Sequence, residues 1–109
     1  MDTKADIING AYSRMRISGI TKKPTPEEIS KALRRLELMC AAWSKRGICT
    51  GYAVEDDPDP ATPHNVPSGY IAGVEANLAV LLLADYGKSA PASLHLEARG
   101  FLGIITTES

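Results

Sequence analysis

The stretch from Glu27 to Pro60, EEISKALRRLELMCAAWSKRGICTGYAVEDDPDP, places an amphipathic helix, a glycine turn and an acidic loop one after another. The helix has clear start signals, because Thr25 suits its N-cap and Pro26 its first position, with acidic residues in the first turn. Basic residues and Gly47 mark its end. Apolar side chains recur every three or four positions and predict a buried face made of Ile29, Leu33, Leu36, Met39 or Cys40, and Trp43.

The charged residues of this helix define its other face. Those that point away from the apolar stripe are Lys31, Arg34, Arg35 and Glu37. Such a face is either a solvated surface with ion pairs or a contact for an acidic partner or for DNA phosphates. The residues that we predict to bind a partner are Arg34, Arg35, Lys45 and Arg46.

The segment between Gly47 and Pro67 lacks a helical period and is rich in acidic residues and proline. Residues 48–54 leave room for a short strand. Loops of roughly 20 residues are uncommon in compact domains and are either functional or mobile. We therefore predict a contact surface on this loop, formed by Glu55, Asp56, Asp57 and Asp59.

Three further segments have helical patterns. Thr3 and Asp6 form a capping box for a first helix that stops near Ser18-Gly19, and its expected buried stripe is Ile7, Ile8, Ala11, Tyr12 and Met15. A third helix opens at Pro67 or Ser68 and is apolar almost all round, so it belongs at the centre. Its expected stripe is Ile71, Val74, Leu78, Leu81 and Leu82.

The fourth helix starts after Ser89 and Pro91, and its expected buried residues are Leu94, Ala98, Phe101 or Leu102, and Ile105. In the third helix, Gly69 and Gly73 lack side chains one turn apart and would permit close approach of another helix, from the same subunit or from a neighbouring one. We predict an all-α fold, a small antiparallel bundle of about four helices with one long acidic, proline-rich loop, in a single helical domain spanning residues 1–109.

The composition excludes several classes of protein. With 44% apolar and 23% charged residues, the chain has the usage of a soluble globular domain. A net charge of −1 gives no general attraction to nucleic acid, so any DNA contact would be local. The longest apolar run, Leu78–Ala84, is too short for a bilayer, and no signal peptide is evident. We expect no membrane partner, assembly in the cytoplasm, and reduced thiols at Cys40 and Cys49.

Candidate chemistry is sparse in this sequence. Cys49 with His64 is a conceivable thiolate pair, although a small turn residue and a loop histidine explain both. The acidic loop with His64 is oxygen-rich enough for a hard cation, but its spacing fails the EF-hand pattern. Two loop carboxylates would suit glycoside hydrolysis only with a pocket between them. We therefore predict no enzyme, no catalytic or metal-binding residues and no cofactor.

The run from Leu33 to Asp57, LRRLELMCAAWSKRGICTGYAVEDD, resembles the signature of tail accessory factors, the head-to-tail adaptors of short-tailed phages. This family stabilises packaged DNA and completes the head. The resemblance continues more weakly through the third helix to ADYGKSAP and the last helix. The residues that match the family pattern best are Trp43, Gly47, Thr50, Gly51, Tyr52, Asp56 and Asp57.

The resemblance implies a structural virion protein without catalysis. It implies a dodecameric ring of this chain beneath the portal protein, which closes the filled head and forms a platform for downstream tail proteins. Packaged DNA would pass through the channel without sequence-specific contact, and the protein would be found in the virion after assembly in the host cytoplasm. Family members often carry a long C-terminal arm that grips the portal, whereas this sequence ends at Ser109, so the resemblance leaves the mode of portal attachment open.

Two other functions remain open from the sequence. One is a small helical regulator or DNA- or partner-binding module in which TPEEISKALRRLELM supplies the contact helix, although a basic excess and a helix-turn-helix pair are missing. The other is a small hydrolase that uses the acidic loop. The molecular size of a complex with the portal would separate these alternatives from the adaptor.

Overall fold

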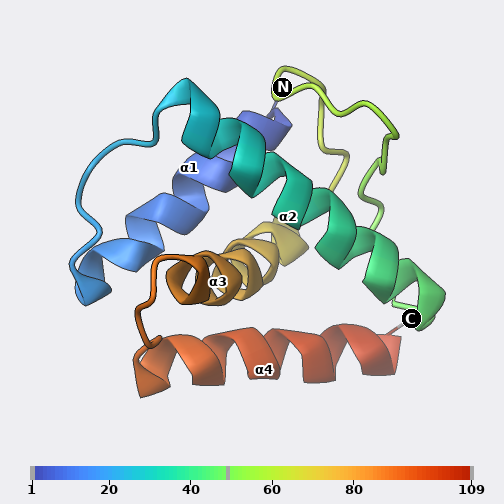
Figure 1. Ribbon diagram of the computed structural model, residues 1–109. Helices are drawn as coiled ribbons and strands as arrows, with labels where there is room; N and C mark the ends of the chain where they lie inside the picture. The colour runs from blue at the N-terminus through green and yellow to red at the C-terminus, as the bar shows by residue number, and fades with distance from the viewer. Residues whose placement is uncertain (1, 49, 109) are drawn as a thin grey trace.

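The computed structural model describes residues 2–48 and 50–108, and this part of the chain contains four α-helices (Figure 1). They are α1 (Lys4–Met15), α2 (Pro26–Lys45), α3 (Ser68–Asp85) and α4 (Ala92–Glu108), and a short 3-10 turn, η1 (Arg16–Ser18), follows α1. Within the described ranges there is no strand, so the short strand allowed for residues 48–54 is absent there. The predicted all-α fold is confirmed.

Local capping chemistry sets the start of the first two helices. At α1 the Thr3 backbone N–H donates to the Asp6 carboxylate over 2.8 Å. At α2 the Thr25 backbone N–H donates to the Glu28 carboxylate over 2.9 Å, and the Glu28 backbone N–H donates to the Thr25 hydroxyl over 3.2 Å. These two hydrogen bonds form a reciprocal capping box. Gly47 then ends α2 with a φ of 80°, a left-handed conformation that glycine adopts without strain.

Helix α3 is the central element. In Figure 1 it is seen almost along its axis while α2 and α4 are seen from the side, with α4 below it and α1 and α2 above it. It contacts all three of these helices. Its 18 residues have a mean hydropathy of 1.2, enough by length and composition to cross a membrane, a test that the core helices of soluble proteins also pass. The contacts on several sides account for an apolar surface that is not confined to one stripe.

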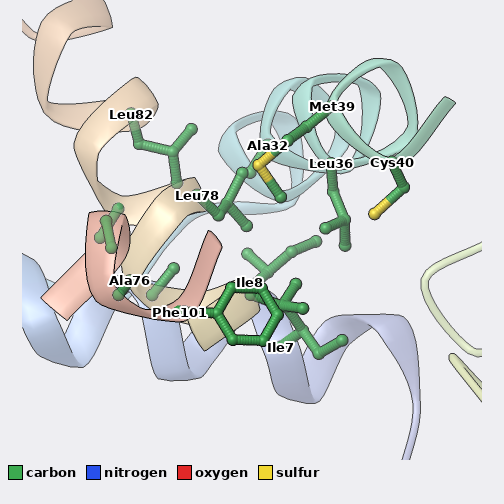
Figure 2. Close-up of a cluster of buried hydrophobic side chains, with 14 of the residues drawn as sticks. Ile7, Ile8, Ala32, Leu36, Met39, Cys40, Ala76, Leu78, Leu82 and Phe101 are labelled. Atoms are coloured by element: carbon green, nitrogen blue, oxygen red, sulfur yellow. The ribbon is translucent and has the colours of Figure 1, made fainter. Parts of the chain in front are cut away.

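The core combines one face from each helix (Figure 2). All five residues predicted on α1 are buried, and so are Trp43 and most of the α2 stripe. On α3, Val74, Leu78 and Leu82 of the predicted stripe are buried, whereas Ile71 and Leu81 are only half-buried. Gly73, Ala76, Ala79 and Leu83 are buried in addition. The buried residues of α4 are Leu94, Ala98, Phe101 and Ile105.

Two glycines allow helices to approach closely. A Cβ placed on Gly73 would lie 2.0 Å from the Phe101 ring, so α3 and α4 touch there. A Cβ on Gly10 would lie 2.0 Å from the Glu75 carboxylate, which explains a glycine in the middle of α1. Gly69 faces open space and makes no such contact. The close approach expected at the glycine pair is therefore confirmed within the chain at Gly73. At Gly69 no helix of this chain comes close, and approach by a neighbouring copy stays a prediction.

A polar cluster joins α1, α2 and the end of α3. The Tyr86 hydroxyl donates to Glu28, and the Tyr12 hydroxyl lies 2.8 Å from that of Tyr86. Lys22 pairs with the same Glu28 carboxylate over 2.8 Å. The Lys22 ammonium, then the Thr25 amide and the Tyr86 hydroxyl, lower the pKa of Glu28 from 4.5 to about 2.

We predict that Gly73→Ala destabilises the fold by about 1–3 kcal/mol, because the added methyl group overlaps the Phe101 ring and forces repacking of α3 against α4. Urea denaturation followed by circular dichroism measures the change. The matched control is Gly69→Ala, which meets no atom within 4 Å and should leave the free energy of unfolding unchanged or slightly higher. Equal losses for both variants would contradict the close contact.

We also predict that Glu28→Gln lowers the melting temperature at neutral pH and that this difference disappears in acid. The contacts of Glu28 in the folded protein favour its ionised form and lower its pKa from 4.5 to about 2. The stability that these contacts contribute is therefore fully present above pH 4.5 and is lost as the pH falls toward about 2. Melting curves of the two proteins across this pH range test the point. A constant difference down to the lowest pH would show that the carboxylate charge is not responsible.

Candidate functional site

The acidic loop is tied to the first turn of α1. The backbone N–H groups of Lys4 and Ala5, which have no partner within the helix, donate to the carbonyls of Thr62 and Pro60 over 2.9 and 3.0 Å. Thr3 pairs with Pro63 in an isolated bridge. The loop therefore caps α1 and is fixed to it at residues 60–63.

The side chain of Lys4 makes a second and stronger tie. It is fully buried, with 0% of its surface exposed. Its ammonium lies 3.0 Å from a Glu37 oxygen, 2.7 Å from a Glu55 oxygen and 2.6 Å from the Ala53 carbonyl oxygen. Three N–H donors thus meet three acceptors, as a buried ammonium requires. These contacts join α1, α2 and the loop at one point.

Glu37 corrects the sequence interpretation, which placed it on the exposed face of the second helix. Only 6% of its surface is exposed. One of its oxygens accepts from Lys4 and also from the Glu55 backbone N–H, over 2.9 Å. Its position one turn after Leu33 and one turn before Cys40 was the available signal, since both neighbours belong to the apolar stripe.

Further polar side chains are buried around this cluster. The Lys4 ammonium lies 4.7 Å from the centre of the Tyr52 ring. The Tyr52 hydroxyl and one Glu37 oxygen are buried, and neither has a hydrogen-bond partner among the described residues. Burial is the main cause that raises the pKa of Tyr52, and the nearby Glu37 carboxylate raises it further. Burial, with a smaller effect of Glu37, also raises the pKa of the Cys40 thiol to about 12. Cys40 is therefore an uncharged core residue, unsuited to nucleophilic chemistry.

A groove of about 560 Å³ lies between α2 and the acidic loop. Its apolar part includes Leu38 and Val54, large side chains that are 60% and 47% exposed. Charged residues border them, with Arg34 on α2 and with Asp56 and Asp57 on the loop. An exposed apolar strip flanked by charges of both signs is the composition of a protein-binding surface. We call it the α2–loop groove.

The predicted partner-binding residues fall into three groups. Arg34, Asp56 and Asp57 come together in the α2–loop groove. Two others have partners inside the chain: Arg35 binds Asp85 through two nitrogens, over 2.8 and 2.5 Å, and Glu55 binds Lys4. Outside the groove lining lie Lys45, Arg46 and Asp59. Partner binding by all eight residues stays a prediction.

The conceivable reactive groups do not gather in the described part of the chain. Cys49 lies outside it. His64 is buried, and its Nδ1 accepts the Val66 backbone N–H over 2.8 Å, so this ring serves to hold the loop. Across residues 2–48 and 50–108, no three His, Cys, Asp or Glu side chains lie close enough together to hold a metal ion.

Comparison with known proteins gives no further guide. No protein-family model matches the sequence, and no curated protein matches it either. The α2–loop groove is therefore the best-supported candidate site on geometry alone.

We predict that Lys4→Met destabilises the protein by about 3–5 kcal/mol, because it leaves the buried Glu37 carboxylate without its counter-charge. Chemical denaturation gives the free energy of unfolding. Lys31→Met is the matched control, since Lys31 is exposed on α2 and its loss should change stability by less than about 0.5 kcal/mol. Similar effects of the two substitutions would refute the role assigned to Lys4.

Proposed function

We propose that this protein is a structural virion protein, a head-to-tail adaptor that binds the portal ring after DNA packaging. In this role copies of the chain form a dodecameric ring, close the filled head and offer a platform to the tail proteins that follow. The ring surrounds the channel through which packaged DNA passes, and it makes no sequence-specific contact with the DNA. The mature location is the virion connector.

One observation carries the proposal. The stretch that resembles the tail accessory factors, Leu33–Asp57, supplies both walls of the α2–loop groove, from Leu33 and Arg34 on the helix to Asp56 and Asp57 on the loop. Of the residues that match the family pattern best, Asp56 and Asp57 line this groove. Both are exposed, so they are available to a partner.

The rigidity of the groove supports a binding role. One wall is a 20-residue helix, and the other is a loop held by Lys4 and by the amides of α1. A surface that is already ordered loses little conformational entropy when it binds a partner. Repetition of the same groove around a ring would then turn modest individual contacts into a stable assembly.

The charges suggest how the groove is used. Arg34 on one wall faces carboxylates on the other, so the surface presents both signs over a short span. Complementary charges on a portal subunit or on the neighbouring copy would orient the encounter, and the exposed Leu38 and Val54 would supply the apolar contact.

The test is to mix the purified protein with its cognate portal and to measure the mass of the complex by light scattering. We expect a large complex with a fixed ratio of adaptor to portal subunits. Leu38→Asp should weaken this binding by at least about tenfold, because it replaces an exposed apolar side chain of the groove lining with a charge.

The matched control is Leu96→Asp, on α4, where the leucine is 70% exposed and away from the groove. This variant should bind as the parent does. If the protein stays a monomer or dimer and does not bind the portal, the result would contradict the adaptor function and favour the small helical regulator. Equal binding by both variants would leave the adaptor function standing and move its contact surface elsewhere.

A further inference from the structure

A second concave site lies beside the linker that joins α1 to α2. In Figure 1 this linker and the acidic loop lie on opposite sides of the molecule. It has a volume of about 260 Å³. One wall is the C-terminal half of α1 with η1, and the other is the linker itself. Its polar lining residues are Asn9, Ser13, Arg16, Lys22 and Lys23. We call it the basic pocket.

The walls of the basic pocket carry an unbalanced positive charge. Three cationic side chains line it, and none of its lining residues is acidic. Lys22 alone has a counter-ion, Glu28, which lies outside the lining. Arg16 and Lys23 form no ion pair with any described residue. Because like charges gathered in a concave surface repel one another and focus the field, the pocket attracts anions.

The geometry supplies donors from two sides. On α1, Asn9, Ser13 and Arg16 recur at intervals of four and three residues, so they share one face of the helix and the turn that follows. Lys22 and Lys23 approach from the linker. No described partner engages the side chains of Asn9 and Ser13, so an amide and a hydroxyl remain available beside the cations.

The linker is held in place, which keeps these donors together. Glu28 fixes Lys22, and the same carboxylate is bonded to Tyr86, whose hydroxyl touches that of Tyr12 in the pocket wall. The Ile20 backbone N–H donates to the Met15 carbonyl over 3.3 Å, after the left-handed turn at Gly19. The pocket is therefore a surface site whose linker wall is fastened to α1 and α2.

We propose that the basic pocket binds a phosphate group, supplied either as free phosphate or as a phosphodiester of nucleic acid. A phosphate accepts hydrogen bonds in several directions, which suits donors that converge from a helix and a linker. The planar Arg16 guanidinium can bind two of its oxygens, and the lysines provide point charges. This site does not depend on the α2–loop groove or on the adaptor function.

The first experiment is a titration with inorganic phosphate at constant pH and ionic strength, followed by amide chemical shifts, with chloride as the reference salt. We expect saturable shifts in residues 9–24 and no comparable change elsewhere. The double variant Arg16→Ala/Lys23→Ala should bind at least about tenfold more weakly, a change that corresponds to about 1.4 kcal/mol. Both side chains are exposed, so the fold should persist, as a melting curve would verify.

The matched control is Lys31→Ala/Lys45→Ala, which removes two positive charges from α2 and none from the pocket. This variant should bind phosphate as the parent protein does. A second titration with a short DNA duplex separates the two sources of the ligand. Shifts at residues 9–24 with DNA assign the site to phosphodiesters, and shifts with phosphate alone assign it to the free anion.

Three results would overturn the proposal. The first is the absence of saturable shifts with either ligand, and the second is equal weakening in both double variants, which would mean general screening of charge. The third is a shift of the same amides that depends only on protein concentration and vanishes in Asp56→Lys/Asp57→Lys. In that case the acidic loop of a second copy would occupy the pocket.

Discussion

The buried ammonium of Lys4 is the interaction on which the rest of the structure depends. A full charge with no exposed surface is tolerable only where its donors are all matched, and here two carboxylates and a carbonyl provide the match. The cost of burying it is the reason for the arrangement around it. Helix α1 must meet α2 at Glu37, and the loop must fold back far enough to bring Glu55 and the Ala53 carbonyl to the same point.

This constraint explains how a segment without regular structure becomes a defined surface. The loop is held at two places, at residues 53 and 55 by Lys4 and Glu37 and at residues 60, 62 and 63 by the start of α1. These two anchors keep the segment between them beside α2. The binding role proposed for the α2–loop groove relies on that relation, because a freely moving loop would present no lasting groove.

Sequence reasoning found what local chemistry determines. The capping boxes at Thr3 and Thr25, and the turn at Gly47, could be read because their partners lie within a few residues. The ion pairs of Lys4 with Glu37 and Glu55 could not be predicted, because those residues are 33 and 51 positions away in the sequence. The position of Lys4 one turn before Ile7 and Ile8 places it on the apolar stripe of α1, but nothing near it in the chain identifies its partners. For the same reason the α2–loop groove was anticipated only as two separate charged segments, and the pairing of Arg35 with Asp85 was missed.

The distance in sequence between α1 and the groups that cap it also governs how the protein can be made. When the ribosome releases the first helix, its counter-charges at Glu37 and Glu55 and the carbonyls of Pro60 and Thr62 have not yet been synthesised. Until they emerge, a buried Lys4 would be an uncompensated charge, so the nascent helix has no stable docking position. The native docking of α1 must therefore wait until these residues of the middle of the chain have been synthesised.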